Sequence, residues 1–384
     1  MDFDFTWILL GLPIAFTLGW LASRADLRQL RIENHQAPKA YFRGLNFLLN
    51  EQQDQAIDAF IEAVQNDPDT SELHFALGNL FRRRGEYERA VRVHEHLLQR
   101  GDLPQLERDR AQHALALDYL KAGLLDRAET ALRKLEGTSY EEEARLALLS
   151  IYERSRDWQH ATDIASKLNS AGHASFTGRQ AHYLCEQANA LVATGDTSQA
   201  LNLLELACST ASASARPLLD LAKLQVQRSQ PQVAFDTLIK LEKAAPQAMP
   251  LAAGLLVTIA QNDALRPQVM ALLKTHYQHT PSVDVMDAIA RLEKDPVASR
   301  QGFIQHLETE TSLVAAARWV AGEKPTNAAE EHNHKLVQRA LDQATKPLMR
   351  YRCAACGFEA TQHFWHCPGC QAWDSYPARR IEEL

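Results

Sequence analysis

The chain has 384 residues, a formal net charge of −7 and six cysteines. Hydrophobic residues make up 46% and charged residues 23%, so most of the chain can bury a core and is not disordered. The acidic balance argues against a broad nucleic-acid-binding surface, which needs clustered Lys and Arg. A mean hydropathy of −0.32 excludes a polytopic membrane protein, although such a mean is compatible with one spanning segment.

The N-terminal region contains one long apolar run. Residues 5–23 read FTWILLGLPIAFTLGWLAS, 19 residues without a charge, which is enough for a helix to cross a bilayer. The alternative is a cleaved signal peptide, but such a leader opens with positive charge and has a shorter apolar stretch. Here Asp2 and Asp4 precede the run. We therefore predict a retained transmembrane anchor in segment 1–23, followed by a juxtamembrane linker over residues 24–36.

The residues around and within this run predict its orientation and a contact. Four basic residues lie between positions 24 and 39, and none precedes the run. By the positive-inside rule, we expect the N-terminus to lie outside and the rest of the chain in the cytoplasm, with a single pass through the membrane. Gly11, Ala15 and Gly19 recur every four residues on one helix face, where small side chains allow a second transmembrane helix to pack closely.

The middle of the chain contains a repeat. Two segments align without gaps at a shift of 34 residues, which pairs Gly44 with Gly78, Phe47 with Phe81 and Ala56 with Ala90. The small residue recurs at intervals of 33 to 39 as Ala56, Ala90, Ala128, Ala161, Ala200 and Ala234. This pattern resembles the tetratricopeptide repeat, a helix–turn–helix unit of about 34 residues. We expect six such repeats over residues 37–248 and degenerate helical repeats over residues 249–346.

Stacked repeats of this kind build a superhelix with a concave groove lined by the first helix of each pair. On the repeat register the residues facing the groove are Tyr41, Phe75, Asn79, Arg82, His113, Leu117, His182 and Asn189. Any one of them taken alone is better explained as an ordinary solvated or half-buried helix residue. As a set they predict an extended protein-binding surface, with no catalytic group.

Four of the six cysteines lie in the last 32 residues. They form two Cys-x-x-Cys pairs, Cys353 with Cys356 and Cys367 with Cys370. Two such turns can present four sulfurs to one tetrahedral ion, so we predict a metal domain over residues 347–384. Disulfides are disfavoured by the predicted reducing compartment, and a thioredoxin-like site needs only one such pair. The other two cysteines, Cys185 and Cys208, lie in repeat helices and are expected to be small buried hydrophobic residues.

The metal segment resembles a rubredoxin-type domain through Cys-x-x-Cys-Gly followed by Cys-Pro-x-Cys, and this resemblance implies iron. The loop between the two pairs is shorter than in rubredoxins, and Gln371 stands where the final Gly is usual. A zinc ribbon fits equally well, so iron and zinc both remain open. A segment this short needs the metal to fold. Five aromatic residues are expected to form its small core: Phe358, Phe364, Trp365, Trp373 and Tyr376.

Both ends and the first two repeats together resemble one family, that of lipopolysaccharide assembly protein B of Gram-negative bacteria. The residues that carry the resemblance are YFRGLNFLLNEQQDQAIDAF, LGNLFRRRGEYERAVRVH and YRCAACGF…FWHCPGCQAW. The resemblance implies an inner-membrane adaptor, not an enzyme, that regulates lipopolysaccharide (lipid A) biosynthesis. It would promote degradation of the UDP-3-O-acyl-N-acetylglucosamine deacetylase by a membrane-bound AAA+ metalloprotease. An inner-membrane protein that senses lipopolysaccharide would restrain it through the anchor, and other lipopolysaccharide assembly proteins would be partners.

Two other functions remain open from the residues. An iron tetrathiolate could make the chain an electron-transfer protein. A zinc ribbon could bind nucleic acid through Arg350, Arg352, Arg379 and Arg380, although the net charge weighs against it. The sequence contains no phosphate-binding loop, nucleophile elbow or His-Glu-x-x-His helix, which favours a non-enzyme. The expected fold is an all-α superhelical solenoid with an N-terminal transmembrane helix and a small C-terminal rubredoxin-like or zinc-ribbon domain.

Overall fold

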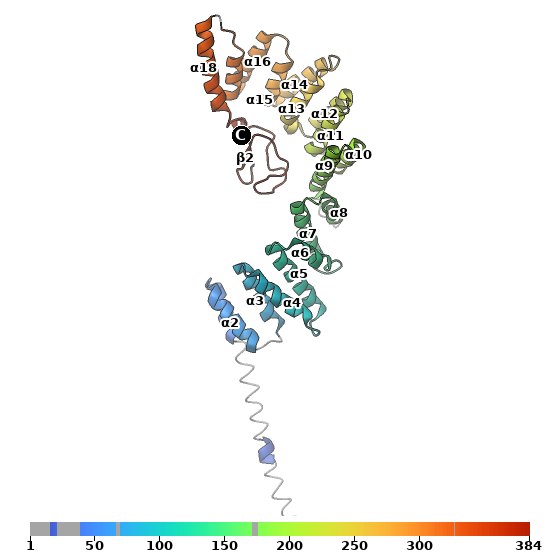
Figure 1. The fold of residues 1–384 in the computed structure, drawn as a ribbon, viewed down its shortest axis with the longest axis vertical. Helices are drawn as coiled ribbons and strands as arrows, with labels where there is room; N and C mark the ends of the chain where they lie inside the picture. Colours follow the sequence, from blue (N-terminus) through green and yellow to red (C-terminus); the bar gives the residue numbers. More distant parts are fainter. Residues whose placement is uncertain (1–15, 21–38, 67–69, 171–175, 326) are drawn as a thin grey trace, which may run out of the picture. The chain divides into compact units, whose positions relative to one another are not determined.

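The structure, a computed structural model, describes residues 16–20, 39–66, 70–170, 176–325 and 327–384. It divides into two compact units, of which the first ends at Ser155 and the second runs from Arg156 to Leu384. We call their described parts unit 1 and unit 2. Within both units most residues lie in short antiparallel helices (Figure 1).

Unit 1 is built of helical pairs that follow one another along the chain. Residues 39–49 form a helix. The elements that follow are α2 (Gln53–Asn66), α3 (Ser71–Arg84), α4 (Tyr87–Gln99), α5 (Gln105–Lys121), α6 (Leu125–Arg133) and α7 (Glu141–Ser155). The turn from α3 to α4 depends on Gly85, whose φ of 85° lies in the left-handed region that glycine adopts without strain.

The repeat pattern reflects close approach between the helices of a pair. All six recurring alanines are completely buried, from Ala56 to Ala234. A Cβ atom added at Gly78 would lie 2.5 Å from the His94 ring, and one added at Gly44 would lie 3.1 Å from the ring of Phe60. A ring from the second helix of each pair therefore lies directly against the glycine of the first.

Unit 2 continues with helices α8 to α18 and ends in a small domain. The helices are α8 (Trp158–Ser170), α9 (Thr177–Thr194), α10 (Thr197–Thr210), α11 (Ala215–Gln227), α12 (Pro231–Ala244), η2 (Pro246–Ala248), α13 (Met249–Ile259), α14 (Arg266–His279), α15 (Val283–Leu292), α16 (Pro296–Thr309), α17 (Leu313–Ala321) and α18 (Ala328–Thr345). Five of them, α12, η2, α13, α14 and α16, have Pro at the first or second position, where its missing N–H costs nothing. The largest apolar core runs from α11 to α17.

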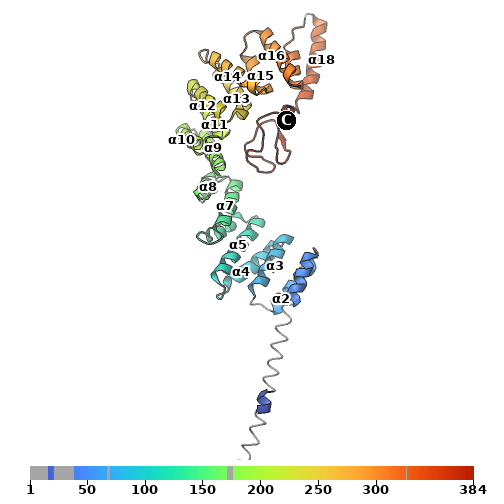
Figure 2. The same ribbon diagram turned by 180° about the vertical axis from the view of Figure 1, so that it is seen from behind.

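The C-terminal domain contains the only strands among the described residues, β1 (Tyr351–Arg352) and β2 (Glu359–Ala360), and a last short helix, η3 (Ile381–Glu383). The strands pair antiparallel, with Tyr351 opposite Ala360. Figures 1 and 2, seen from opposite sides, show this domain enclosed on one side by the helices of unit 2. The contacts described below explain this position.

The fold class is confirmed as an all-α repeat solenoid with a small C-terminal metal-type domain. The predicted span over residues 5–23 overlaps the described residues only at 16–20, which are helical. Of the predicted helix-contact residues only Gly19 is described; Gly11, Ala15 and the linker 24–36 lie outside the described residues. Within the described ranges, no helix has the length and apolar character needed to cross a membrane.

Candidate metal centre

The first cysteine pair lies in a tight turn between β1 and β2. The backbone N–H of Gly357 donates to the carbonyl of Cys353 at 2.9 Å, and the N–H of Cys353 donates to the carbonyl of Phe358 at 2.9 Å. Gly357 has a φ of 78°, a left-handed conformation suited to glycine. The turn thereby directs the sulfurs of Cys353 and Cys356 toward the same point.

The second cysteine pair repeats this geometry. The N–H of Gln371 donates to the carbonyl of Cys367 at 2.9 Å, and the N–H of Cys367 donates to the carbonyl of Ala372 at 2.9 Å. Gln371 therefore occupies the position equivalent to Gly357, with a φ of 59° that a side chain adopts only under strain. The sequence prediction that Gln371 replaces a glycine has a structural counterpart here.

The four sulfurs fit a single tetrahedral ion. The Sγ atoms of Cys353 and Cys370 are 3.8 Å apart, those of Cys356 and Cys367 are 3.7 Å apart, and all four lie within 4.8 Å of one another. A tetrahedron with metal–sulfur bonds of about 2.3 Å has sulfur–sulfur edges of about 3.8 Å. Zinc and iron both accept four thiolates. When bound, the ion cross-links the two turns and supplies folding energy to a domain with little apolar core.

Hydrogen bonds prepare part of this cluster to bind a cation. Burial acts to raise the pKa of the Cys353 thiol, but the Ser375 hydroxyl and backbone N–H groups outweigh it and lower that pKa to about 6. For the Cys367 thiol, burial again acts to raise the pKa, but hydrogen bonds from the backbone N–H groups of Cys370 and Gly369 outweigh it and lower that pKa. Both of these sulfurs are buried, whereas Cys356 and Cys370 are exposed. One sulfur of each pair thus faces the domain core and the other faces solvent.

Two tryptophans attach the metal domain to the helices of unit 2. The Trp373 ring stacks on His182 of α9 with centroids 4.9 Å apart, and on His366 of its own domain at 4.3 Å. His182 Nε2 lies 2.8 Å from a carboxylate oxygen of Asp374. Trp365 packs against the large apolar core of unit 2. The interface therefore combines apolar burial with one polar contact, between the buried His182 and the exposed Asp374.

The last residues of the chain form a second attachment. The Arg380 guanidinium donates to both carboxylate oxygens of Asp284 in α15, at 2.8 and 3.1 Å. Glu383 accepts from the backbone N–H of Val283 at 2.6 Å, and Glu382 accepts from the N–H of Val314 at 3.1 Å. Free N–H groups at the starts of α15 and α17 are thereby satisfied by carboxylates about 70 to 100 residues away in sequence.

The metal domain thus contacts the first helices of successive pairs in unit 2. Those contacts involve His182 in α9, Leu251 in α13, Asp284 in α15 and Val314 in α17. The expected aromatic core is only partly correct. Tyr376 is buried beside the sulfurs, but Phe358 is 44% exposed, and Trp365 and Trp373 turn toward the helices because these offer more apolar surface than a domain of this size.

Comparison with known families agrees with both halves of this description. A family model described as a rubredoxin metal binding domain matches residues 351–376, and one described as a tetratricopeptide repeat matches residues 73–108. Lipopolysaccharide assembly protein B of Escherichia coli (strain K12) is 30% identical over 404 aligned residues, which cover 98% of this chain and 99% of that protein. The chain belongs to the lipopolysaccharide assembly protein B family.

A second relative extends the match within the family. Lipopolysaccharide assembly protein B of Haemophilus influenzae is 26% identical over 402 residues, covering 96% of each chain. Among solved structures, a tetratricopeptide repeat protein from Parabacteroides merdae is 13% identical with a TM-score of 0.33, covering 67% of this chain and 98% of that one. A chain of the Naa15/Naa10 complex with HypK-THB is 13% identical with a TM-score of 0.39, and the match covers 79% of this chain and 53% of that one. Scores this low support no statement about function.

In this member of the lipopolysaccharide assembly protein B family, several predicted groove residues of unit 1 bind one another. The Phe75 side chain is buried beneath the Arg110 guanidinium, which lies 4.1 Å from its ring centroid. Arg82 donates to Asp118 at 2.9 Å and also to Asn79. These three predicted residues therefore make contacts that stabilise the solenoid.

The remaining predicted residues differ in exposure. Tyr41 is half-buried, with its ring 5.9 Å from that of Phe60. His113 stacks on Tyr140 at 5.0 Å, and burial lowers its pKa. Leu117 is half-buried and Asn189 is exposed. His182 is completely buried under the metal domain, so in this structure it binds Asp374 and not an external partner.

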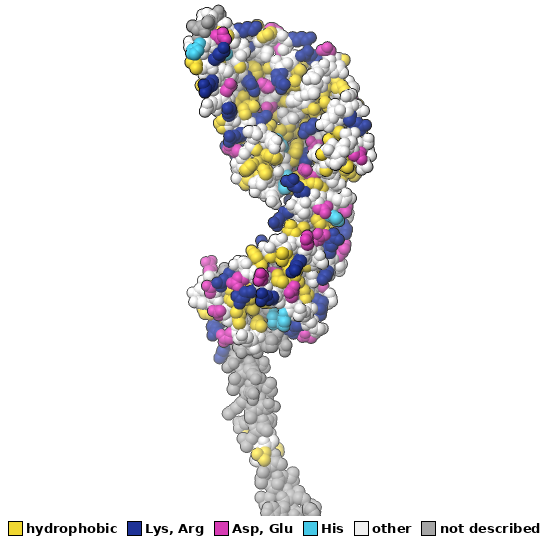
Figure 3. All heavy atoms as spheres, viewed as in Figure 1, with side chains coloured by type: hydrophobic (Ala, Val, Ile, Leu, Met, Phe, Trp, Pro, Cys, Tyr) yellow, Lys and Arg dark blue, Asp and Glu magenta, His cyan; other side chains and the backbone are white. Residues whose placement is uncertain are grey.

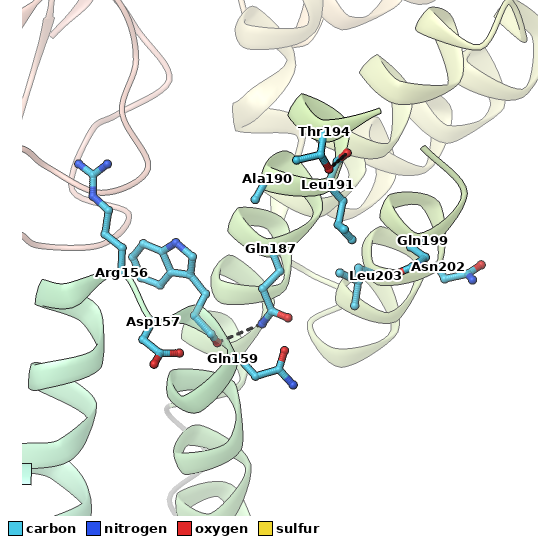
Figure 4. Close-up of a pocket in the computed structure, with 11 residues that line it drawn as sticks. Arg156, Asp157, Gln159, Gln187, Ala190, Leu191, Thr194, Gln199, Asn202 and Leu203 are labelled. Carbon is cyan, nitrogen blue, oxygen red and sulfur yellow. Dashed lines mark hydrogen bonds between the residues drawn. The ribbon is translucent and has the colours of Figure 1, made fainter. Parts of the chain in front are cut away.

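Helices α8, α9 and α10 form a groove on unit 2 that was not predicted from the sequence (Figure 4). It has a volume of about 880 Å³, and its lining is mostly apolar and amide side chains, including Leu191, Leu203, Gln187 and Asn202. Gln187 is already engaged, because its amide donates to the backbone carbonyl of Trp158 at 3.0 Å. No pattern in the sequence marks these positions, since they come from three separate helices.

Proposed function

We propose that this chain is a non-enzymatic scaffold in lipopolysaccharide assembly, anchored in the inner membrane by residues 5–23. It would hold the UDP-3-O-acyl-N-acetylglucosamine deacetylase and a membrane AAA+ metalloprotease together and so promote proteolysis of the deacetylase. The observation that carries this proposal is the identity of 30% over 98% of the chain to a protein named for lipopolysaccharide assembly.

The fold is compatible with a scaffold. A repeat solenoid offers a long surface on which two proteins can bind at once, and holding them together raises their effective concentration. The metal cluster supports this reading as well, because four thiolates complete a tetrahedral shell and leave no open position for catalysis. The Gly11, Ala15 and Gly19 face is the proposed contact for an inner-membrane protein that senses lipopolysaccharide.

The proposal is tested by crosslinking and purification from membranes. The full chain should recover the protease and the deacetylase, whereas a chain without residues 1–23 should lose the membrane protease. Recovery of neither enzyme with the full chain would contradict the scaffold proposal. Loss of the lipopolysaccharide-sensing protein alone on changing Gly19 to Leu would identify the anchor face as its contact.

One observation favours electron transfer as a second candidate. Cys356 and Cys370 are exposed, and Phe358 beside them is 44% exposed, so a partner could approach the ion on this edge. Metal analysis of the purified chain decides the matter. A zinc-loaded chain with full function would remove this candidate, whereas bound iron with a reversible redox couple would support it.

Binding of nucleic acid receives no support from the arginines of the metal domain. Arg352 and Arg350 both contact Glu359, at 2.8 and 3.6 Å, and Arg380 is bound to Asp284. Arg350 and Arg352 share one carboxylate, so two of these three positive charges are offset, and the net charge of the whole chain is −7. We therefore do not expect salt-dependent RNA or DNA binding by this chain.

A further inference from the structure

The groove of unit 2 already has an occupant. The metal domain contacts first helices from α9 to α17, where a repeat solenoid would bind a partner. A client that binds a concave surface must therefore use positions that the metal domain leaves exposed. The first helices of unit 1 carry such positions.

Three of these positions hold a basic residue at the same place in the repeat. Arg83 in α3, Lys121 in α5 and Arg154 in α7 each precede a recurring alanine by seven residues. All three are exposed. None of the three forms an ion pair or a hydrogen bond with another described residue. We call Arg83, Lys121 and Arg154 the basic row.

The neighbours of Arg83 show that this lack of a partner is specific. Arg82 donates to Asp118 at 2.9 Å, and Arg84 pairs with Asp54 and with Glu86. Arg83 lies between these two satisfied arginines and has no carboxylate of its own within the described chain. The charge of Arg83 is therefore not used to hold the repeats together.

Apolar side chains lie on the same helices as the basic row. Leu146 in α7 is 42% exposed, and Leu49 in the helix over residues 39–49 is 78% exposed and also precedes its alanine by seven residues. Of the carboxylates on these helices, Glu72 is bound to Arg110 at 2.6 Å. The charge of Glu143 raises the pKa of His113, against the larger opposite effect of burial. Figure 3 shows Lys and Arg side chains mixed with hydrophobic and acidic ones over α3 and α5.

We propose that the basic row binds an acidic and apolar, extended segment of the client protein. Neighbouring helices are spaced about 8–10 Å apart, and an extended chain in the polyproline II conformation has three residues per turn and advances about 3.1 Å per residue. Acidic residues at every third position would therefore meet successive members of the row, while leucines between them contact the exposed apolar side chains. This inference rests on the proposed scaffold function and specifies the chemistry of its client.

The basic row does not continue into the next two repeats, which are in unit 2. The equivalent residues of the next two repeats are Ala193 and Gln227, seven before Ala200 and Ala234. Only three repeats therefore carry a basic residue at this position that can bind an acidic residue of the client segment. Electrostatic attraction of this kind also speeds association and weakens as salt is added.

The test measures binding of a labelled peptide of repeated Glu-Leu-Ser units to the full chain in detergent. The R83Q/K121Q/R154Q variant should bind this peptide about tenfold more weakly than the parent chain and lose most of the salt dependence. The control variant K134Q/K167Q/K243Q removes three basic residues at the ends of second helices, so it matches the charge change and the helix position. It should bind within about twofold of the parent chain.

The outcomes separate this inference from the scaffold proposal. Equal peptide binding by the parent chain and the R83Q/K121Q/R154Q variant would overturn the basic row as a site. So would equal binding of a Gln-Leu-Ser peptide by the parent chain. If the parent chain binds the acidic peptide through the row but recovers no deacetylase from membranes, the scaffold proposal fails and the surface stands. If the variant still recovers the deacetylase as well as the parent does, the scaffold stands and the row is not its client site.

Discussion

Gly357 and Gln371 close equivalent turns of the metal domain, but the two residues differ in the backbone strain that a positive φ causes. Both have a positive φ, 78° and 59°, but only glycine adopts that region freely. We predict that Gly357→Ala lowers the free energy of unfolding of the loaded domain by about 1 kcal/mol. Gln371→Gly should change it in the opposite direction by a smaller amount, because glycine also gains entropy in the unfolded chain.

Thermal unfolding of the metal-loaded chain measures both changes. Gly254→Ala is the control, because Gly254 lies inside α13 with no atom near an added Cβ. In that helix alanine should stabilise by about 1 kcal/mol. A Gly357→Ala variant as stable as the parent would show that the turn is not constrained as described.

His306 makes the stability of unit 2 depend on pH. Burial lowers its pKa, while Glu310 and Glu382 act weakly in the opposite direction. The Tyr277 hydroxyl and Nδ1 of His306 are 2.5 Å apart, so the neutral ring can accept this hydrogen bond and the protonated ring cannot. In the unfolded chain the histidine ring has its ordinary pKa of about 6.5. As pH falls through this value, the unfolded chain takes up a proton before the folded chain does, and the free energy of unfolding decreases.

Denaturant unfolding between pH 8 and pH 5 tests this coupling. The parent chain should lose stability over this range more steeply than the His306→Gln variant, by at most about 1.4 kcal/mol per pH unit. His279→Gln is the control, because His279 is exposed at the end of α14. Identical pH slopes for the parent and the His306→Gln variant would contradict the assignment.

At the residue scale the sequence predicts what local spacing determines. The four ligands follow from two Cys-x-x-Cys turns, and their sulfurs do converge. The alanine and glycine positions follow from the repeat and are buried or closely approached. Partners that are distant in the chain do not follow from spacing. His182 is an example, because its neighbour Asp374 lies 192 residues away in sequence.

At the scale of elements, the C-terminal helix η3 acts as a cap for two helices that precede it. We predict that Glu382→Ala with Glu383→Ala destabilises unit 2 by about 1–2 kcal/mol, since N–H groups at the starts of α15 and α17 lose their acceptors. Hydrogen exchange should rise at Val283 and Val314 and remain unchanged in α4 of unit 1.

The matched control for this prediction is Leu384→Ala. Leu384 ends the chain directly after the two glutamates and is 61% exposed, so its removal should change neither stability nor exchange. Unchanged exchange at Val283 and Val314 in the double variant would show that water replaces the carboxylates without loss. In that case the C-terminal residues would not fix the metal domain.

The elements themselves follow from the sequence better than their assembly does. The turn at Gly85 and the prolines at the starts of α12, α14 and α16 are local signals. The attachment of the metal domain is not local. Its tryptophans were expected in a core of their own, but a domain of this size buries them more fully against the helices of unit 2.

At the scale of the whole molecule, the metal should control the interface within unit 2. We predict that Cys367→Ser abolishes metal binding, exposes Trp365 and Trp373 to water and increases hydrogen exchange in α9 and α15. A red shift of tryptophan fluorescence and loss of bound metal measure this. Cys208→Ser is the matched control, because Cys208 lies in α10 and burial raises its pKa to about 11.

A Cys367→Ser chain with unshifted fluorescence and unchanged exchange in α9 would show that the metal domain stays in place without its ion. The division of the molecule after Ser155 is a further feature that the sequence did not predict. The boundary lies between Ala128 and Ala161, whose spacing of 33 is as regular as any in the chain. A repeat period indicates each pair of helices and not where the chain divides into compact units.

The lifetime of the deacetylase in the native host tests the central claim most directly. If this chain is a scaffold for proteolysis, deletion of its gene should lengthen the half-life of the deacetylase several-fold. The parent chain and Cys208→Ser should restore the short half-life, and Cys367→Ser should not. An unchanged half-life after deletion would contradict the account.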